Sequence, residues 1–214
     1  MRELIDLFLN VDKHLADFVQ AHGRVVYGLL FAIVFAETGL VVTPFLPGDS
    51  LLFAAGALAG SGMLDLRLLL ILFIVASVLG DAVNYAVGRY IGPRVFRPEG
   101  RRGRFERLLN PKHLERTHEF FERHGGKAVV MARFVPIVRT FIPFVAGAGA
   151  MTYSSFAFYN VSGGVLWVVI CVGAGYLFGG IPVVKENFEL VVVGIVFVSV
   201  LPMIIEGVRQ WRSA

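Results

Sequence analysis

Three long apolar stretches stand out when hydrophobic and polar positions are followed along this chain. They cover residues 67–90, 153–180 and 187–208. As a helix the first is about 36 Å long, and the hydrocarbon core of a bilayer is ~30 Å thick. Each stretch therefore predicts a helix that spans a membrane.

Two further apolar regions, residues 25–59 and 127–151, are interrupted by polar residues, glycines and prolines. The residues that we expect to break their helices are Pro44, Pro47, Gly48, Pro136, Pro143 and Gly147. Each half is too short to cross a bilayer as a helix, so both regions are predicted to be re-entrant hairpins. Irregular backbone at membrane depth is tolerated only where it is buried in protein or lines a watery cavity, so the breaks indicate a site.

The charged segments predict the orientation. Ten Lys or Arg residues and five Glu residues lie between Arg94 and Lys127, which indicates that the loop 91–126 is cytoplasmic. Each hairpin returns to the side from which it entered, so three spans also place the C-terminus in the cytoplasm. Residues 1–24 alternate apolar and charged positions, which predicts an amphipathic helix lying on the outer face of the bilayer.

A weak internal repeat links the two halves. A shift of 91 residues places Phe53, Gly56, Tyr85 and Gly88 on Phe144, Gly147, Tyr176 and Gly179. Each copy is a hairpin followed by one crossing, so the second copy must be inverted. The predicted fold is an all-α polytopic membrane protein with two inverted repeats, which form the membrane domain 25–180, and a C-terminal transmembrane helix at 187–208.

Composition narrows the class of protein further. The chain has 214 residues, of which 56% are hydrophobic, and its mean hydropathy is +0.71. A soluble protein of this size cannot bury so much apolar surface, which argues against a cytosolic enzyme and against disorder. The single cysteine, Cys171, excludes a disulfide framework and a cysteine metal cluster, and no cofactor or metal is predicted. The basic segment has no aromatic stacking platform, so we expect no nucleic-acid partner.

Four ionisable residues lie inside the broken regions: Glu37 and Asp49 in the first, Arg133 and Arg139 in the second. A charge at the bilayer centre costs ~2.5 kcal/mol or more. A purely structural explanation of these residues is that they form two buried ion pairs that hold the hairpins together. A functional role explains them better, because hydrophobic residues often stabilise a buried position equally well.

The two arginines predict an anionic ligand. On a straight helix they would point in different directions, but a kink at Pro136 can bring both into one cavity. The guanidinium group matches phosphate or carboxylate with two parallel hydrogen bonds and keeps its charge when desolvated. Helix starts expected near Ser50 and Phe144 would add backbone N–H groups to the site.

Glu37 and Asp49 are predicted to couple the site to protons. A carboxylate in a low-dielectric site can gain and lose protons at physiological pH, and protonation of either one would release an arginine for phosphate. The span 67–90 supplies further polar groups. Asp81, Asn84, Tyr85 and Gly88 share one helix face there, and Arg89 follows. Structural explanations of these residues stay open: Asp81 can pair inside the bundle, and Arg89 can snorkel to the membrane edge. Close helix packing is likewise an open explanation for Asn160.

The motifs together resemble the DedA family, also called the SNARE-associated or VTT-domain family. The residues that carry this resemblance are Glu37-Thr38-Gly39, Pro47-Gly48-Asp49, Gly80-Asp81, Tyr85-x-x-Gly88-Arg89, Arg133-Phe134-x-Pro136-x-x-Arg139, Pro143, Ala146-Gly147 and Asn160-x-x-Gly163. The resemblance implies a bacterial inner-membrane protein with two re-entrant hairpins that translocates lipid. It also implies dependence on the acidic residues at positions 37 and 49 and the arginines at positions 133 and 139.

The function expected from these features is proton-motive-force-dependent transport of an anionic lipid phosphate, with undecaprenyl phosphate as the first candidate. Arg133 and Arg139 would bind the phosphate, Glu37 and Asp49 would couple protons, and Asp81, Tyr85, Arg89 and Asn160 would support them. The alternatives are a phospholipid scramblase or flippase and a small-ion or proton antiporter. We expect no enzyme, because His113, His118 and His124 match no catalytic signature. A bundle this small leaves room for a homodimer.

Overall fold

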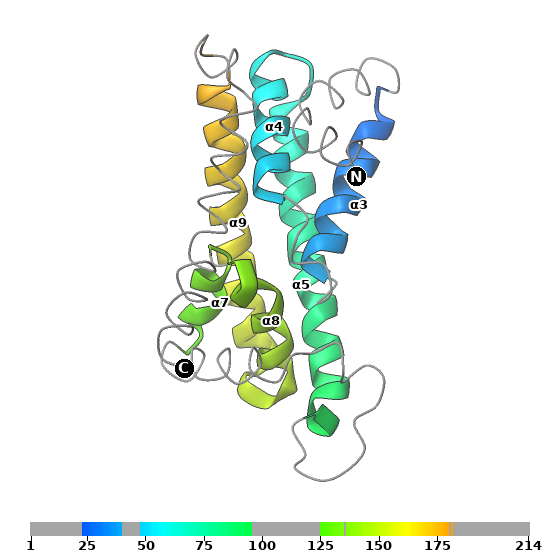
Figure 1. Cartoon of the computed structure of the whole chain (residues 1–214), viewed down its shortest axis with the longest axis vertical. Helices are drawn as coiled ribbons and strands as arrows, with labels where there is room; N and C mark the ends of the chain where they lie inside the picture. Colours follow the sequence, from blue (N-terminus) through cyan, green and yellow to red (C-terminus); the bar gives the residue numbers. More distant parts are fainter. Residues whose placement is uncertain (1–22, 40–47, 96–124, 135, 180, 182–214) are drawn as a thin grey trace, which may run out of the picture. The chain divides into compact units, whose positions relative to one another are not determined.

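The computed structural model of the chain describes residues 23–39, 48–95, 125–134, 136–179 and 181 (Figure 1). The described elements are the helices α3 (Val25–Gly39), α4 (Gly48–Gly60), α5 (Leu66–Val95), α7 (Lys127–Ala132), α8 (Pro136–Val145) and α9 (Tyr153–Phe178), with a π-helical turn η1 (Ala146–Ala150) before α9. These ranges contain no strand, so the all-α class is confirmed. The predicted helices at 1–24 and 187–208, and residues 96–124 of the basic loop, lie outside the described residues.

Two of the described helices have the length and composition of membrane spans. They are residues Leu66–Gly92 of α5 and the whole of α9. α9 matches the prediction at 153–180 closely, whereas α5 continues to Val95, five residues beyond the predicted end. Pro93 lies in its last turn, where the missing N–H removes a single backbone hydrogen bond.

The start of α5 follows from a capping residue. The Asp65 carboxylate accepts a hydrogen bond from the Leu68 backbone N–H at 2.8 Å, which satisfies one of the free donors of the first turn. The Asp65 N–H in turn donates to the Tyr27 hydroxyl at 2.8 Å. Gly62 has a positive φ of 81° and makes the tight turn that separates α4 from this cap.

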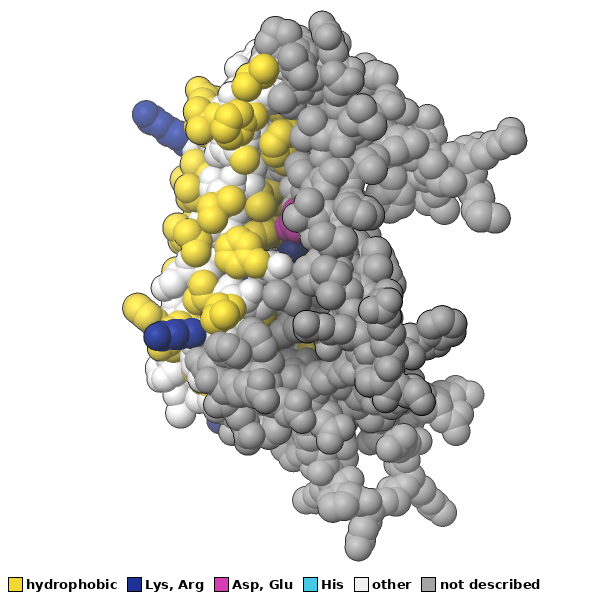
Figure 2. All heavy atoms as spheres, turned by 60° about the vertical axis from the view of Figure 1, so that its left-hand side comes forward, with side chains coloured by type: hydrophobic (Ala, Val, Ile, Leu, Met, Phe, Trp, Pro, Cys, Tyr) yellow, Lys and Arg dark blue, Asp and Glu magenta, His cyan; other side chains and the backbone are white. Residues whose placement is uncertain are grey.

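The outer face of α5 is hydrophobic. Its exposed apolar side chains recur every three or four residues and are Leu68, Ile71, Val75, Leu79 and Val83. Figure 2 shows hydrophobic side chains covering the described part of one face, with Lys and Arg projecting from it at separate heights. An unbroken apolar stripe of this kind suits contact with lipid tails, as expected of a helical membrane protein.

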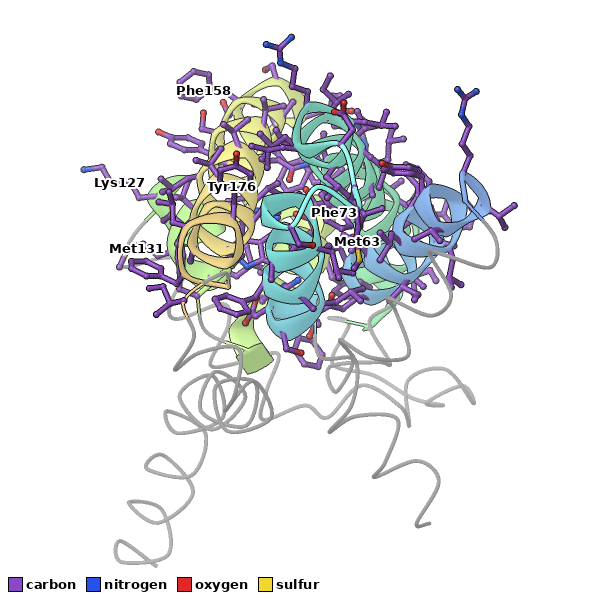
Figure 3. The ribbon with its side chains drawn as sticks, turned by 90° about the horizontal axis from the view of Figure 1, so that it is seen from above. Met63, Phe73, Lys127, Met131, Phe158 and Tyr176 are labelled. Atoms are coloured by element: carbon purple, nitrogen blue, oxygen red, sulfur yellow. The ribbon has the colours of Figure 1, made fainter. Side chains whose placement is uncertain are left out.

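The described residues form two compact units. Unit 1 contains residues 23–34, 48–76 and 166–179 together with 181, and unit 2 contains residues 35–39, 77–95, 125–134 and 136–165. In unit 1 the core includes Leu52, Phe73 and Val172, which have no exposed surface. Figure 3 shows Phe73 pointing inward.

Close glycine packing holds α4 against the second half of α9 in unit 1. A Cβ atom at Gly56 would overlap the carbonyl oxygen of Val172, and one at Gly175 would overlap the carbonyl oxygen of Phe53. A Cβ atom at Gly179 would meet the side chain of Ala57. Only glycine permits the two backbones to approach this closely.

Unit 2 packs α8 and η1 against α5 in the same manner. Cβ atoms at Gly147, Gly88 and Gly92 would overlap the Tyr85 carbonyl, the Phe144 carbonyl and the Ala148 side chain, respectively. The core beside this contact consists of Tyr85, Ala128, Val129, Ala132, Ile142, Ala146 and Phe156. On the outside of the unit, Lys127, Met131 and Phe158 point away from the helices (Figure 3).

The two sets of contacts differ in register from the sequence match on which the predicted repeat rests. The shift of 91 residues holds for the broken segments, since Gly147 corresponds to Gly56. The contacts on the long helices match Gly88 with Gly175, which is a shift of 87 and not 91. The sequence match was one helical turn out because glycines recur at an interval of four in both spans, so either register aligns them.

Candidate functional site

In the second broken region, the helix is interrupted directly after Arg133. α7 ends at Ala132, Arg133 follows as its C-terminal cap, and α8 begins at Pro136. Proline is favoured at the first position of a helix, where its missing N–H has no partner to lose. The helix start predicted near Phe144 is therefore wrong, because Phe144 lies in the last turn of α8. The start predicted near Ser50 is close to the observed start of α4 at Gly48.

Arg139, on α8, forms an ion pair with Glu37, near the end of α3. The Arg139 Nη2 and Glu37 Oε1 atoms are 3.1 Å apart. Glu37 is 5% exposed and Arg139 is 9% exposed, so both charges are removed from solvent. Two residues that the sequence predicted to act together are thus in contact.

Arg133, directly after α7, forms an ion pair with Asp81 of α5. Its Nη2 donates to Asp81 Oδ2 and, at 2.6 Å, to Asn160 Oδ1. The Asn160 amide group donates in turn to the Val78 carbonyl of α5 at 3.1 Å. This second bond orients the Asn160 oxygen toward the guanidinium group.

Glycines on α9 leave room for the arginine side chain. A Cβ atom at Gly163 would lie 3.2 Å from Arg133 Cδ and Nε, and one at Gly164 would lie 3.5 Å from Nη2. Close packing, which the sequence left open as an explanation for this part of α9, therefore accounts for these glycines. The side chain against which they pack is an arginine of the site.

Asn84 is a member of this cluster to which sequence reasoning gave no role. It has no exposed surface, and its Nδ2 donates to the carbonyls of Thr140 at 2.8 Å and Thr38 at 3.5 Å. These threonines directly follow Arg139 and Glu37 in the chain. The position of Asn84 on the same helix face as Asp81 was the available signal.

Asp49 lies in unit 1, at the start of α4. It is half-buried, and its Oδ1 accepts a hydrogen bond from Trp167 Nε1 at 2.7 Å. The arginines belong to unit 2. The expectation that Asp49 meets Arg133 or Arg139 in one watery cavity stays a prediction.

The remaining predicted residues are Tyr85, Arg89 and those expected to break the helices. The Tyr85 hydroxyl donates to the Met151 carbonyl at 2.9 Å, and its ring stacks on Phe156 with centroids 4.6 Å apart. Arg89 is exposed, which agrees with snorkelling. Pro44 and Pro47 lie outside the described residues, whereas Pro143 is inside α8 and Gly147 is in η1. No cluster of three metal-ligating side chains occurs in the part of the chain that the structure describes.

The cluster in unit 2 carries two positive and two negative side chains. Glu37, Asp81, Arg133 and Arg139 are the buried charged residues among those described, and their formal charges cancel. A buried ion pair persists because each partner would be costly alone. An anion can enter such a cluster only if it replaces a carboxylate as the partner of an arginine.

The fold and this cluster define a helical membrane protein with buried charges at its helix breaks. The chain matches the VTT domain over residues 46–177. It is 51% identical over 213 residues to Protein DedA of Escherichia coli K12, which covers 99% of this chain and 95% of that protein. It is also 36% identical over 179 residues to the inner membrane protein YghB of the same strain, with coverage of 84% and 78%. No solved structure matches the chain. The chain belongs to the DedA family.

Proposed function

We infer that this protein is a proton-coupled transporter that moves an anionic lipid phosphate across the membrane together with protons. Undecaprenyl phosphate is the candidate substrate, and recycling to the cytoplasmic leaflet is the candidate direction. The observation that carries this proposal is the burial of two arginines beside helix breaks, each paired with a carboxylate. The proposed setting is the bacterial inner membrane, the compartment named for the relative YghB.

The ion pair between Arg139 and Glu37 supplies a coupling step. A proton bound by Glu37 removes its charge and weakens the pair, so the guanidinium group becomes available to a phosphate. Release of the proton restores the carboxylate as a competitor and expels the phosphate. Proton and phosphate therefore occupy the site together, while the lipid tail stays among the apolar faces of the helices.

The two units support an alternating-access mechanism. Both pack a short helix against a long one through the same three glycine contacts, as expected for copies of one repeat. We propose that the copies are inverted and that each broken region is a re-entrant hairpin. Inverted repeats with interrupted helices at mid-membrane are the layout of many secondary transporters.

The test is uptake of undecaprenyl phosphate into proteoliposomes under an imposed pH gradient. Arg139→Lys keeps the charge but loses the planar fork, so we expect uptake to fall by about 10-fold or more. Arg67→Lys is the matched control, because Arg67 is exposed at the start of α5. Uptake by Arg139→Lys equal to that of the control would overturn the role of Arg139.

A second assay separates transport of lipid from transport of ions. Vesicles with a cation gradient and no polyprenyl phosphate should show no protein-dependent ion flux. Ion flux in these vesicles would favour the small-ion antiporter instead. A phospholipid flippase would be indicated by equal movement of labelled phosphatidylglycerol.

A further inference from the structure

Asn84 is a buried polar residue of unit 2, and only one side of its amide group is hydrogen-bonded. Its amide nitrogen contacts the Thr38 and Thr140 carbonyls, but its Oδ1 is buried and has no donor within the described residues. A rotation of the amide by 180° would place Oδ1 against two carbonyl oxygens, so the observed orientation is the favourable one. A buried acceptor without a donor is costly and therefore needs an explanation.

The surroundings of this acceptor indicate what kind of donor it receives. The Asn84 amide holds the backbone directly after Glu37 and directly after Arg139, and Asp81, three residues earlier on α5, holds Arg133. The acceptor thus lies on the helix face that anchors both ion pairs. A ligand bound to the arginines here would present its own hydrogen-bond donor to Asn84.

Net charge does not distinguish a singly protonated phosphate monoester from a phosphate diester at this site. The four buried side chains have no net charge, so a monoanion that enters with one proton leaves the cluster neutral, whereas a dianion needs two protons. A phosphate monoester that keeps one proton and a phosphate diester are both monoanions. The monoester has a P–O–H donor and the diester has none.

We propose that Asn84 is a specificity-determining residue, whose Oδ1 accepts a hydrogen bond from the P–O–H group of a singly protonated phosphate monoester. This inference rests on the proposed transport of a lipid phosphate and narrows its substrate class to monoesters. The lipid then carries its own proton across the membrane, in addition to any proton on Glu37. A diester headgroup of the same charge leaves the Asn84 oxygen without a donor.

The experiment compares polyprenyl phosphate with its methyl diester, which has the same tail and lacks the P–O–H group. Uptake of both is measured in proteoliposomes at pH 5, where each carries one negative charge. The wild-type protein should prefer the monoester by about 10-fold, the size expected of one hydrogen bond to a charged group. Equal rates for the two lipids would overturn the proposal without any variant.

Variants separate this role from a structural one. Asn84→Leu also removes the bonds to the two carbonyls, so both rates fall, but the preference for the monoester should disappear. Asn84→Gln keeps an acceptor and should retain part of the preference. Asn160→Leu is the matched control, because Asn160 is a buried asparagine whose oxygen is occupied by Arg133, and the preference should survive there.

The possible failures are distinguishable. If Asn84→Leu lowers both rates and leaves their ratio unchanged, then Asn84 only ties the backbone or binds a water, and the proposal is wrong. If the wild-type protein moves neither lipid, the transport function itself fails, and the specificity inference fails with it.

Discussion

Unit 1 and unit 2 share their packing and differ in their charges. Each places a short helix on a long one through three glycine contacts of the same kind. All four buried charged side chains among the described residues lie in unit 2, whereas the acidic residue at the break of unit 1, Asp49, is half-buried and bonded to Trp167. The comparison shows that the glycine contacts are common to both units, whereas the buried charges are confined to unit 2 among the described residues.

The largest expected effect comes from breaking an ion pair in unit 2. Arg133→Leu leaves the Asp81 carboxylate buried without its cation, so we expect a loss of about 3–5 kcal/mol in the free energy of unfolding. The double variant Arg133→Leu/Asp81→Leu should regain most of that stability and still transport no lipid. Thermal unfolding in detergent and uptake in proteoliposomes measure the two quantities. A double variant no more stable than the single one would contradict the pairing.

The glycine contacts should respond alike in both units. Gly147→Ala in unit 2 and Gly175→Ala in unit 1 each push a methyl group into a backbone carbonyl, and overpacking of this kind costs about 1–3 kcal/mol. Gly173→Ala is the control, since a Cβ atom there meets nothing within 4 Å. Melting temperatures of the three variants test the prediction. An equal melting temperature for Gly173→Ala and Gly175→Ala would show that the contact in unit 1 is absent.

The bond between Trp167 and Asp49 should have an intermediate effect. Trp167→Phe removes the indole N–H, so the half-buried carboxylate loses a donor, at a cost of about 1.5 kcal/mol. Trp167→Tyr, which brings a hydroxyl group in place of the indole, is the comparison variant. Denaturation monitored by circular dichroism measures the free energy of unfolding. A Trp167→Phe variant as stable as the wild type would show that this bond does not stabilise unit 1.

The smallest effects concern one tyrosine hydroxyl in each unit. Tyr85→Phe removes a part-buried donor to the Met151 carbonyl and should cost about 1 kcal/mol. Tyr27→Phe removes an exposed contact with the Asp65 N–H and should change stability by no more than ~0.5 kcal/mol. The reverse order in a denaturation series would mean that the hydroxyl in unit 1 matters more than its exposure suggests.

Much of the fold was predictable because it depends on local composition. The continuous apolar stretches at 67–90 and 153–180 became α5 and α9, and α4 and α8 begin at the predicted break residues Gly48 and Pro136. The end of α5 and the start of α8 were misplaced by several residues, since a proline at a helix terminus is compatible with either side of the boundary.

The partners of the charges were less predictable. Sequence order suggested Glu37 and Asp49 as the counter-ions of the two arginines, and the structure confirms Glu37 for Arg139. Arg133 pairs with Asp81, on a continuous helix, and Asn84 was given no role although it shares a helix face with Asp81.

The amino-acid sequence by itself determined that this is a helical membrane protein with two broken regions and buried charges beside them. Those features follow from hydropathy and backbone preferences, which act within a few residues along the chain. Tertiary structure alone decided the one-turn register of the glycine contacts and the choice of Asp81 for Arg133. Such choices depend on how each helix is rotated and how closely two backbones approach, and residues far apart in the chain set both.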